Sequence, residues 1–146
     1  MKLKEQLDLL REKYNTKAFI ESDPVQFPHR FKDKKDIEIV SFLIATISWG
    51  KRPMILKSAE KMLNLMGNTP YSYIMDEGYL SLENKNIHRT FFENDLQYYC
   101  KGLHSIYSQY PDLEQVFIQK ESLWEGIHLY RDLMKNANLR VETKHI

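Results

Sequence analysis

A short basic segment between two expected helices has residue types suited to binding phosphate. Residues 48–53 read Ser-Trp-Gly-Lys-Arg-Pro. Glycine lets the backbone approach another group closely, and the helix expected to follow presents free N–H groups and the positive end of its dipole. The segment therefore predicts phosphate contacts by Trp49, Gly50, Lys51 and Arg52. The alternative is a tight interhelical turn with exposed basic residues and a tryptophan anchored in the core.

Two histidine–arginine pairs stand near phenylalanines in segments that we expect to be loops. His29 and Arg30 directly precede Phe31, and His88 and Arg89 precede a second phenylalanine by one threonine. Each pair suits anion binding, or it fixes its loop by bonding backbone carbonyl groups. We favour the structural role for both pairs, because a loop that buries phenylalanine must be held in place.

Motifs of the common enzymes are missing from the sequence. It has no glycine-rich nucleotide loop, no His-Glu-x-x-His zinc motif and no Gly-x-Ser-x-Gly nucleophile motif. The five histidines form no i, i+4 pair, and a lone cysteine, Cys100, excludes a disulfide and a cysteine-based zinc site. We expect Cys100 to be a buried, inert thiol. We predict no catalytic residue, no cofactor and no metal.

Length and charge limit the classes of protein to which the chain can belong. The 146 residues suit one domain, since domains of about 100–150 residues are the commonest. No apolar run approaches the roughly 18–20 residues that span a bilayer, so we expect a cytoplasmic protein without a membrane partner. Residues 1–73 carry 13 basic and 9 acidic side chains, whereas residues 74–146 carry 8 and 11. The basic first half favours an anionic partner, although most such clusters are solvated faces.

Helical periodicity runs through the chain and predicts the elements that position these residues. Residues 37–49 are nearly all apolar, and their length favours a buried helix over a buried strand. Asp33 is the expected N-cap of that helix, with Asp36 at the capping-box position, and Asn94 is the expected cap of a later helix. The fold class expected is all-α, with about six or seven helices, over residues 2–14, 37–49, 53–66, 70–77, 95–108, 112–119 and 123–136. An ordered loop is expected over residues 22–32, and residues 79–93 fit one helical turn and a loop without a hairpin signal.

The order of these motifs resembles the domain-of-unknown-function family 2400. The resemblance runs from about residue 15 to residue 146 and rests on residues 23–24, 28–31, 36–39, 42–46, 49–52, 88–91 and 95–96. The final Lys144-His145-Ile146 resembles a position near the middle of a typical member. The resemblance thus implies that residues 1–146 are a single helical domain from a longer chain, whose missing C-terminal half is a partner of this one.

The family is similar, more remotely, to the helix-hairpin-helix DNA glycosylases. That similarity implies an orthogonal helical bundle resembling part of the glycosylase fold. Ser48 matches the serine of the glycosylase Ser-Ala-Gln motif, but Trp49 and Gly50 replace its alanine and glutamine. A glycine does not fill the gap that a flipped base leaves, and the hairpin with the catalytic lysine and aspartate belongs to the absent half. No residue here inherits a catalytic role.

Two functions follow as expectations. The first is an uncharacterised helical domain that associates with nucleic acid, DNA being the expected partner, through phosphate contacts near Lys51 and Arg52, and that is non-catalytic in this form. The alternative is a helical scaffold or protein-interaction module with no nucleic-acid binding. It predicts an exposed apolar docking surface through which the chain self-associates.

Overall fold

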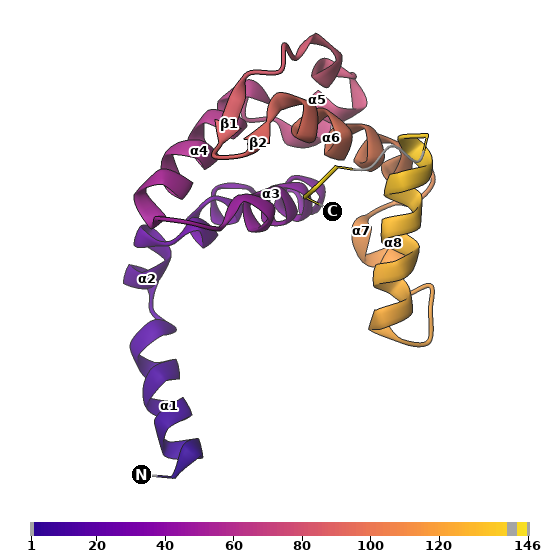
Figure 1. Cartoon of the computed structure of the whole chain (residues 1–146). Helices are drawn as coiled ribbons and strands as arrows, with labels where there is room; N and C mark the ends of the chain where they lie inside the picture. The colour runs from indigo at the N-terminus through magenta and orange to yellow at the C-terminus, as the bar shows by residue number, and fades with distance from the viewer. Residues whose placement is uncertain (1, 140–142, 146) are drawn as a thin grey trace.

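The computed structural model describes residues 2–139 and 143–145, and it is mainly helical, as the sequence predicts (Figure 1). Two short strands pair in antiparallel fashion, with Asn86 opposite Phe92 and His88 opposite Phe91. The elements follow in the order α1 (Leu3–Tyr14), α2 (Lys17–Ser22), η1 (Pro24–Gln26), η2 (Pro28–Arg30), α3 (Lys34–Ile47), α4 (Arg52–Leu65), α5 (Pro70–Met75), η3 (Gly78–Ser81), β1 (Asn86–His88), β2 (Phe91–Phe92), α6 (Glu93–Tyr107), α7 (Leu113–Phe117) and α8 (Leu123–Ala137).

Helix α3 runs through the middle of the molecule, and its apolar run is helical as expected (Figure 1). Asp33 caps it, because its Oδ1 accepts hydrogen bonds from the backbone N–H groups of Lys35, at 2.9 Å, and Asp36, at 3.4 Å. The Asp36 carboxylate does not close a capping box: its Oδ1 accepts from the backbone N–H of Tyr71 at 2.9 Å and ties α5 to α3. The buried side of α3 consists of Ile39, Val40, Leu43, Ile44 and Ile47.

Helix α6 forms the other wall of the core and packs closely against α8. A Cβ atom placed on Gly102 of α6 would overlap Met134 Sδ. A Cβ atom on Gly126 of α8 would lie 2.6 Å from the carbonyl oxygen of Phe117 at the end of α7. Both glycines therefore allow helices to approach at distances that any other residue would increase. Leu103, fully buried on α6, gains on the order of 1.5–3 kcal/mol from its burial.

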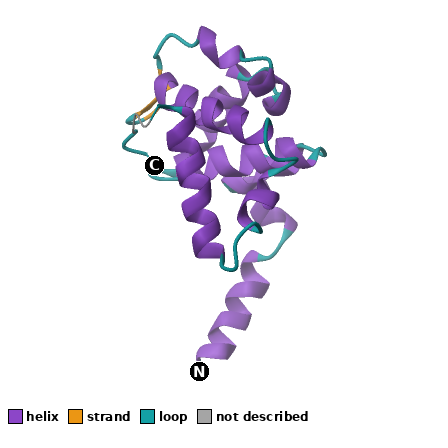
Figure 2. Ribbon diagram, turned by 90° about the vertical axis from the view of Figure 1, so that its right-hand side faces the viewer, coloured by secondary structure: helices purple, strands orange, loops and turns teal. Residues whose placement is uncertain are grey.

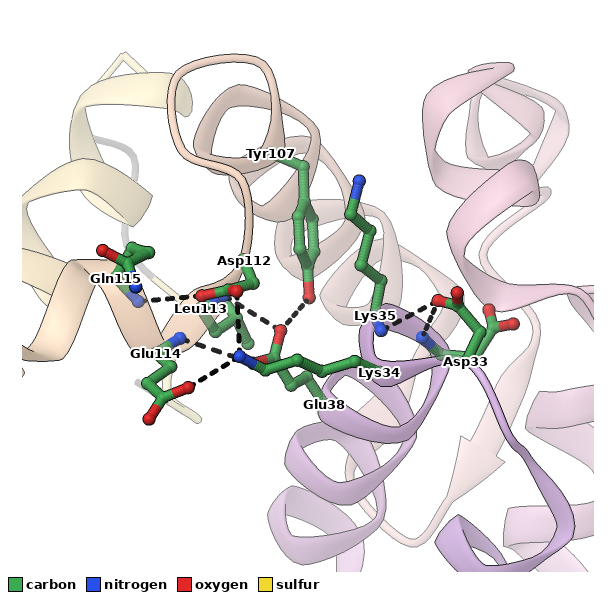
Figure 3. A network of polar contacts seen from close by, with 10 residues as sticks. Asp33, Lys34, Lys35, Glu38, Tyr107, Asp112, Leu113, Glu114 and Gln115 are labelled. Atoms are coloured by element: carbon green, nitrogen blue, oxygen red, sulfur yellow. Dashed lines mark hydrogen bonds and ion pairs between the residues drawn. The ribbon is translucent and has the colours of Figure 1, made fainter.

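A polar network joins the start of α3 to α7 (Figure 3). Glu38 Oε2 accepts hydrogen bonds from the Tyr107 hydroxyl at 3.1 Å and from the backbone N–H of Leu113 at 2.9 Å. Lys34 Nζ lies 2.8 Å from Asp112 Oδ2 and 2.6 Å from Glu114 Oε2. The hydrogen bond from Lys34 holds the pKa of Asp112 below its usual value. Burial first, and then the Glu38 carboxylate, raises the pKa of Tyr107.

Several boundaries differ from the sequence prediction. The sequence does not predict helix α2 or the β1–β2 hairpin, and the segment 22–32, for which it predicts an ordered loop, contains the two 3₁₀ turns η1 and η2. Helix α6 begins at Glu93, not at residue 95, because Asp95 Oδ2 accepts from the backbone N–H of Phe92 at 2.8 Å and makes Phe92 the N-cap in place of Asn94. Helix α3 ends at Ile47, two residues before the predicted end.

Helix α1 stands apart from the packed body. It projects away from the other helices in both views (Figures 1 and 2), and none of its described residues is buried. The helix is interrupted at residues 15–16, and Thr16 then caps α2 by accepting a hydrogen bond from the backbone N–H of Phe19 at 3.3 Å. The amphipathic pattern that predicts α1 therefore forms a helix whose apolar side is exposed, apart from an edge-on contact between the rings of Tyr14 and Phe19, whose centroids are 5.7 Å apart.

Candidate functional site

The α3–α4 junction places the predicted phosphate-binding residues between two helix ends. Ser48 caps the end of α3, and its hydroxyl donates to the carbonyl oxygen of Ile44 at 2.7 Å. Gly50 follows with a φ of +103°, a conformation that side-chain-bearing residues rarely adopt. Lys51 is the N-cap of α4, but its side chain makes no capping hydrogen bond. The N-terminus of α4 is therefore left without a side-chain cap, beside two exposed cationic residues, Lys51 and Arg52.

His88 fixes the β1–β2 hairpin to this junction. Its ring is buried, with Nε2 2.8 Å from the carbonyl oxygen of Trp49 and Nδ1 2.9 Å from Ser58 Oγ. A carbonyl oxygen only accepts hydrogen bonds, so Nε2 carries the proton, and the Ser58 hydroxyl donates to Nδ1 in the neutral ring. Both ring nitrogens are thus occupied by the protein, and His88 acts on the junction by holding the hairpin in place.

The hairpin brings Arg89 onto the junction from a distant part of the sequence. Its guanidinium carbon lies 5.1 Å from the centroid of the Trp49 ring, within the range of a cation–π contact. A Cβ atom on Gly50 would lie 3.0 Å from Arg89 Nη1, so the glycine leaves room for the guanidinium. Arg89 itself has a left-handed backbone, with φ of +48°. The junction therefore gathers cations from two separate segments around one glycine.

The C-terminal segment also contacts the α3–α4 junction, through His145. The His145 ring stacks on Trp49 with centroids 6.3 Å apart and an interplanar angle of 23°, and its Nε2 lies 3.0 Å from the carbonyl oxygen of Thr90. The Tyr99 hydroxyl donates to the carbonyl oxygen of His145 at 2.5 Å. The sequence marks His145 only as part of a family-like ending, and no spacing in it predicts the contact of His145 with Trp49.

The first His-Arg pair lies on another side of the junction. Arg30 Nη1 forms an ion pair with Glu60 Oε2 at 2.8 Å, and its guanidinium carbon lies 4.4 Å from the Phe27 ring centroid. Its charge is therefore matched locally, and it fixes η2 against α4. Phe31 is half-buried against the core, and His29 is exposed at the wall of a groove.

That groove opens beside the junction and has a volume of about 980 Å³. Its walls are η1, η2, α3 and the start of α4, and its lining is apolar along most of its length, including Pro24, Ile37 and Ile55. At one end Arg52 Nη2 lies 3.6 Å from Asp23 Oδ2. Gly50 and Arg52 belong both to the groove lining and to the junction, so the groove and the cationic residues form one continuous surface.

Cys100 is fully buried, and burial raises the pKa of its thiol, so it is a poor nucleophile. Over residues 2–139 and 143–145, no group of three or more histidine, cysteine, aspartate or glutamate side chains is arranged to hold a metal ion. In the same residues, no helix has both the length and the apolar character that crossing a bilayer requires.

Comparison with known proteins identifies a family. The family model described as "Protein of unknown function (DUF2400)" matches residues 23–146. The match covers most of the chain, and the chain therefore belongs to the DUF2400 family, as its motifs suggest. It begins after α1 and α2, so both helices lie outside the matched region. No curated protein and no solved structure gave a match.

Proposed function

We propose that this DUF2400 domain binds nucleic acid, with DNA as the expected ligand, through phosphate contacts at the α3–α4 junction. The observation that carries the proposal is the convergence of Lys51, Arg52 and Arg89 at the uncapped start of α4. A helix N-terminus with basic side chains around it attracts phosphate through its dipole and its free N–H groups. Here the free group is chiefly the Arg52 N–H, because Pro53 has none and the Met54 N–H donates to the Lys51 carbonyl oxygen at 3.0 Å. Half or more of protein–DNA hydrogen bonds go to phosphate and sugar, so such a site fits the commonest kind of contact.

The charge balance at the junction supports this assignment. Among the described residues, neither Lys51 nor Arg89 has a carboxylate within ion-pair distance, whereas Arg52 has Asp23 at 3.6 Å. Lys57 adds an exposed cation on the next turn of α4. The acidic side chain of α4, Glu60, is matched by Arg30. The junction therefore keeps a positive charge that phosphate would neutralise.

The site supports binding of the backbone and not extrusion of a base. Glycosylase-like extrusion needs a side chain that fills the vacated position in the stack, and Gly50 has none. The apolar groove beside Gly50 suits less polar parts of a ligand that enters past the cationic residues. We accordingly propose a binding role for Trp49, Gly50, Lys51, Arg52 and Arg89, and no catalytic role for the described residues.

A salt-dependent titration tests the proposal. Fluorescence anisotropy of a labelled DNA duplex, and of one of its single strands, would be measured at two salt concentrations. Lys51→Ala/Arg52→Ala and, separately, Arg89→Ala are expected to weaken binding. Each variant should also reduce the log–log salt slope by about one for every phosphate that its missing cation neutralised.

The matched control is Lys101→Ala/Arg131→Ala, which removes the same charge from exposed positions of α6 and α8. It should retain the parent affinity and slope more closely than the junction variants. Unchanged binding by both junction variants, or an equal loss in the control, would contradict a specific site at the junction.

A protein-interaction module without nucleic-acid affinity is the second candidate function. The observation that favours it is the exposure of apolar side chains on α1, where Leu3 is 71% and Leu7 is 56% exposed. Such side chains on one helix face are typical of a surface that a partner covers. A flat anisotropy titration combined with concentration-dependent sedimentation would select this function over the first.

A further inference from the structure

Helix α1 carries an apolar stripe with an ordered arrangement of charge around it. With 3.6 residues per turn, one face of the helix holds four exposed side chains, and we call them the α1 stripe: Leu3, Leu7, Leu10 and Tyr14. The same geometry places Lys4 and Arg11 along one edge of the stripe and Lys13 along the other, with Lys13 Nζ 5.2 Å from the Tyr14 ring centroid.

The acidic residues of α1 lie away from the stripe. Glu5, Asp8 and Glu12 fall on the opposite face of the helix. The stripe thus fits an apolar partner surface that carries negative charge. Pairing of two α1 helices is disfavoured, because the residues beside the stripe are basic in both copies and would repel one another.

An exposed apolar surface with carboxylates beside it lies in the C-terminal part of the same chain. Between α7 and the first turn of α8, three side chains are exposed and apolar, and we call them the α7–α8 patch: Ile118 at 60%, Leu123 at 69% and Trp124 at 72%. Residues 118–125 carry two carboxylates, Glu121 and Glu125, against one cation, Lys120, so the segment is acidic by one charge. The Glu125 carboxylate also accepts hydrogen bonds from Ser122, and it remains exposed beside Trp124. Aromatic side chains in such exposed positions are the commonest anchors of protein interfaces.

The two surfaces do not meet within one chain. Helix α1 and the α7–α8 connection form the two separate legs of an arch, with α3 and α6 between them (Figure 1). Contact between them therefore requires a second molecule. We propose that a second copy of this chain supplies it, with each α1 stripe covering the α7–α8 patch of the other copy.

The two reciprocal contacts, α1 of each copy on the α7–α8 patch of the other, form a closed dimer. A twofold axis between the two arches generates two identical contacts and leaves no free end for further copies to join, so the product is a dimer and not a fibre. Two contacts also double the area that a single helix of 12 residues buries. An isolated helix of that length is marginal in water, and docking stabilises its helical state. The inference rests on residues other than those of the nucleic-acid site, so either proposal can fail alone.

Sedimentation velocity of the whole chain, from micromolar to submillimolar concentration, measures the dimer directly. Leu7→Ser and Trp124→Ala are each expected to raise its dissociation constant by at least about tenfold, the effect of losing one strong interface residue. The matched control is Leu9→Ser, because Leu9 is 55% exposed on the same helix but lies off the stripe. Trp124→Ala guards against loss of the dimer through unfolding of α1, since it leaves α1 unchanged.

A charge exchange tests the predicted pairing. Lys4→Glu and Glu121→Lys should each weaken the dimer, and the two substitutions together should restore it. A monomer at every concentration, or a dimer that neither Leu7→Ser nor Trp124→Ala weakens, would overturn the proposal. So would a monomer that binds phosphatidylglycerol vesicles through Leu7, because a lipid surface would then be what the stripe covers.

Discussion

Helices α6 and α1 are both amphipathic, but α6 packs in the core whereas α1 is exposed to solvent. Helix α6 buries nine of its 15 residues, whereas α1 has 12 residues and buries none. Helix α6 is anchored at its start by the hairpin and along its length by α8, while α1 is cut off from the body by the break at residues 15–16. An apolar stripe in a sequence thus shows that a helix face needs a covering partner, but not where that partner lies.

Paired leucine truncations test this comparison most strongly. Leu103→Ala removes a fully buried side chain from α6 and should lower the free energy of unfolding by about 3 kcal/mol. Leu7→Ala in α1, measured in the monomer range, should change it by less than about 0.5 kcal/mol. Urea denaturation followed by circular dichroism gives both values. Equal losses would mean that α1 packs on the body in solution.

The polar network gives the next largest effect. Glu38→Ala leaves the Tyr107 hydroxyl and the Leu113 N–H without their acceptor, and the expected loss is about 2 kcal/mol. Glu12→Ala on the exposed acidic face of α1 is the matched control and should be near neutral. The same urea measurement would contradict the network's role if the two variants proved equally stable.

Replacing a buried tyrosine by phenylalanine is expected to raise the free energy of unfolding, whereas the preceding substitutions lower it. The Tyr130 hydroxyl is buried, with no hydrogen-bond partner among the described residues. Tyr130→Phe should therefore raise the free energy of unfolding by about 1 kcal/mol, because the desolvation cost of that hydroxyl is removed. Tyr14→Phe, at an exposed position of α1, should leave it unchanged. A destabilised Tyr130→Phe variant would reveal a hydrogen bond that the native hydroxyl makes.

The smallest expected effect is on how the stability of the fold falls at low pH. The hydrogen bond from Lys34 lowers the pKa of Asp112 from its ordinary value of 3.8. A carboxyl with a lower pKa in the folded state stabilises fully above its unfolded pKa and loses that contribution as the pH falls through the folded value. Lys34→Met should therefore flatten the decline of stability below pH 3.8, whereas Lys13→Met on α1 should leave it as in the parent. Thermal melts across this range, with parallel curves for the parent and Lys34→Met, would refute the linkage.

Much of the fold was predictable from local signals. Asp33 caps α3 as the sequence predicts, because a capping hydrogen bond joins residues only two or three apart. The hairpin was missed, since its turn carries Arg89 in a left-handed conformation where Gly or Asn is usual. Helix α3 ends two residues before the predicted end because its last turn tightens: the backbone N–H of Ser48 donates to the Ala45 carbonyl oxygen and that of Trp49 to the Ile47 carbonyl oxygen.

The candidate site was predictable in part. Lys51 and Arg52 could be singled out because they adjoin a glycine at a helix boundary. The arrival of Arg89 and His145 at Trp49 depends on the placement of a hairpin and a chain end, which no local spacing specifies. The sequence did mark His88 and Arg89 as unusual, so the residues were identified while their meeting place was not.

The two tryptophans are intrinsic fluorescent probes of two different surfaces of the molecule. Trp49 is half-buried between the rings of His88 and His145 and the guanidinium of Arg89, whereas Trp124 is 72% exposed. One indole thus belongs to each of the two surfaces, and their emission differs because one is shielded from water and the other is not. In a Trp124→Phe chain the fluorescence reports on the junction alone, and in a Trp49→Phe chain on the α7–α8 patch alone. Each surface can then be observed separately, without an added label.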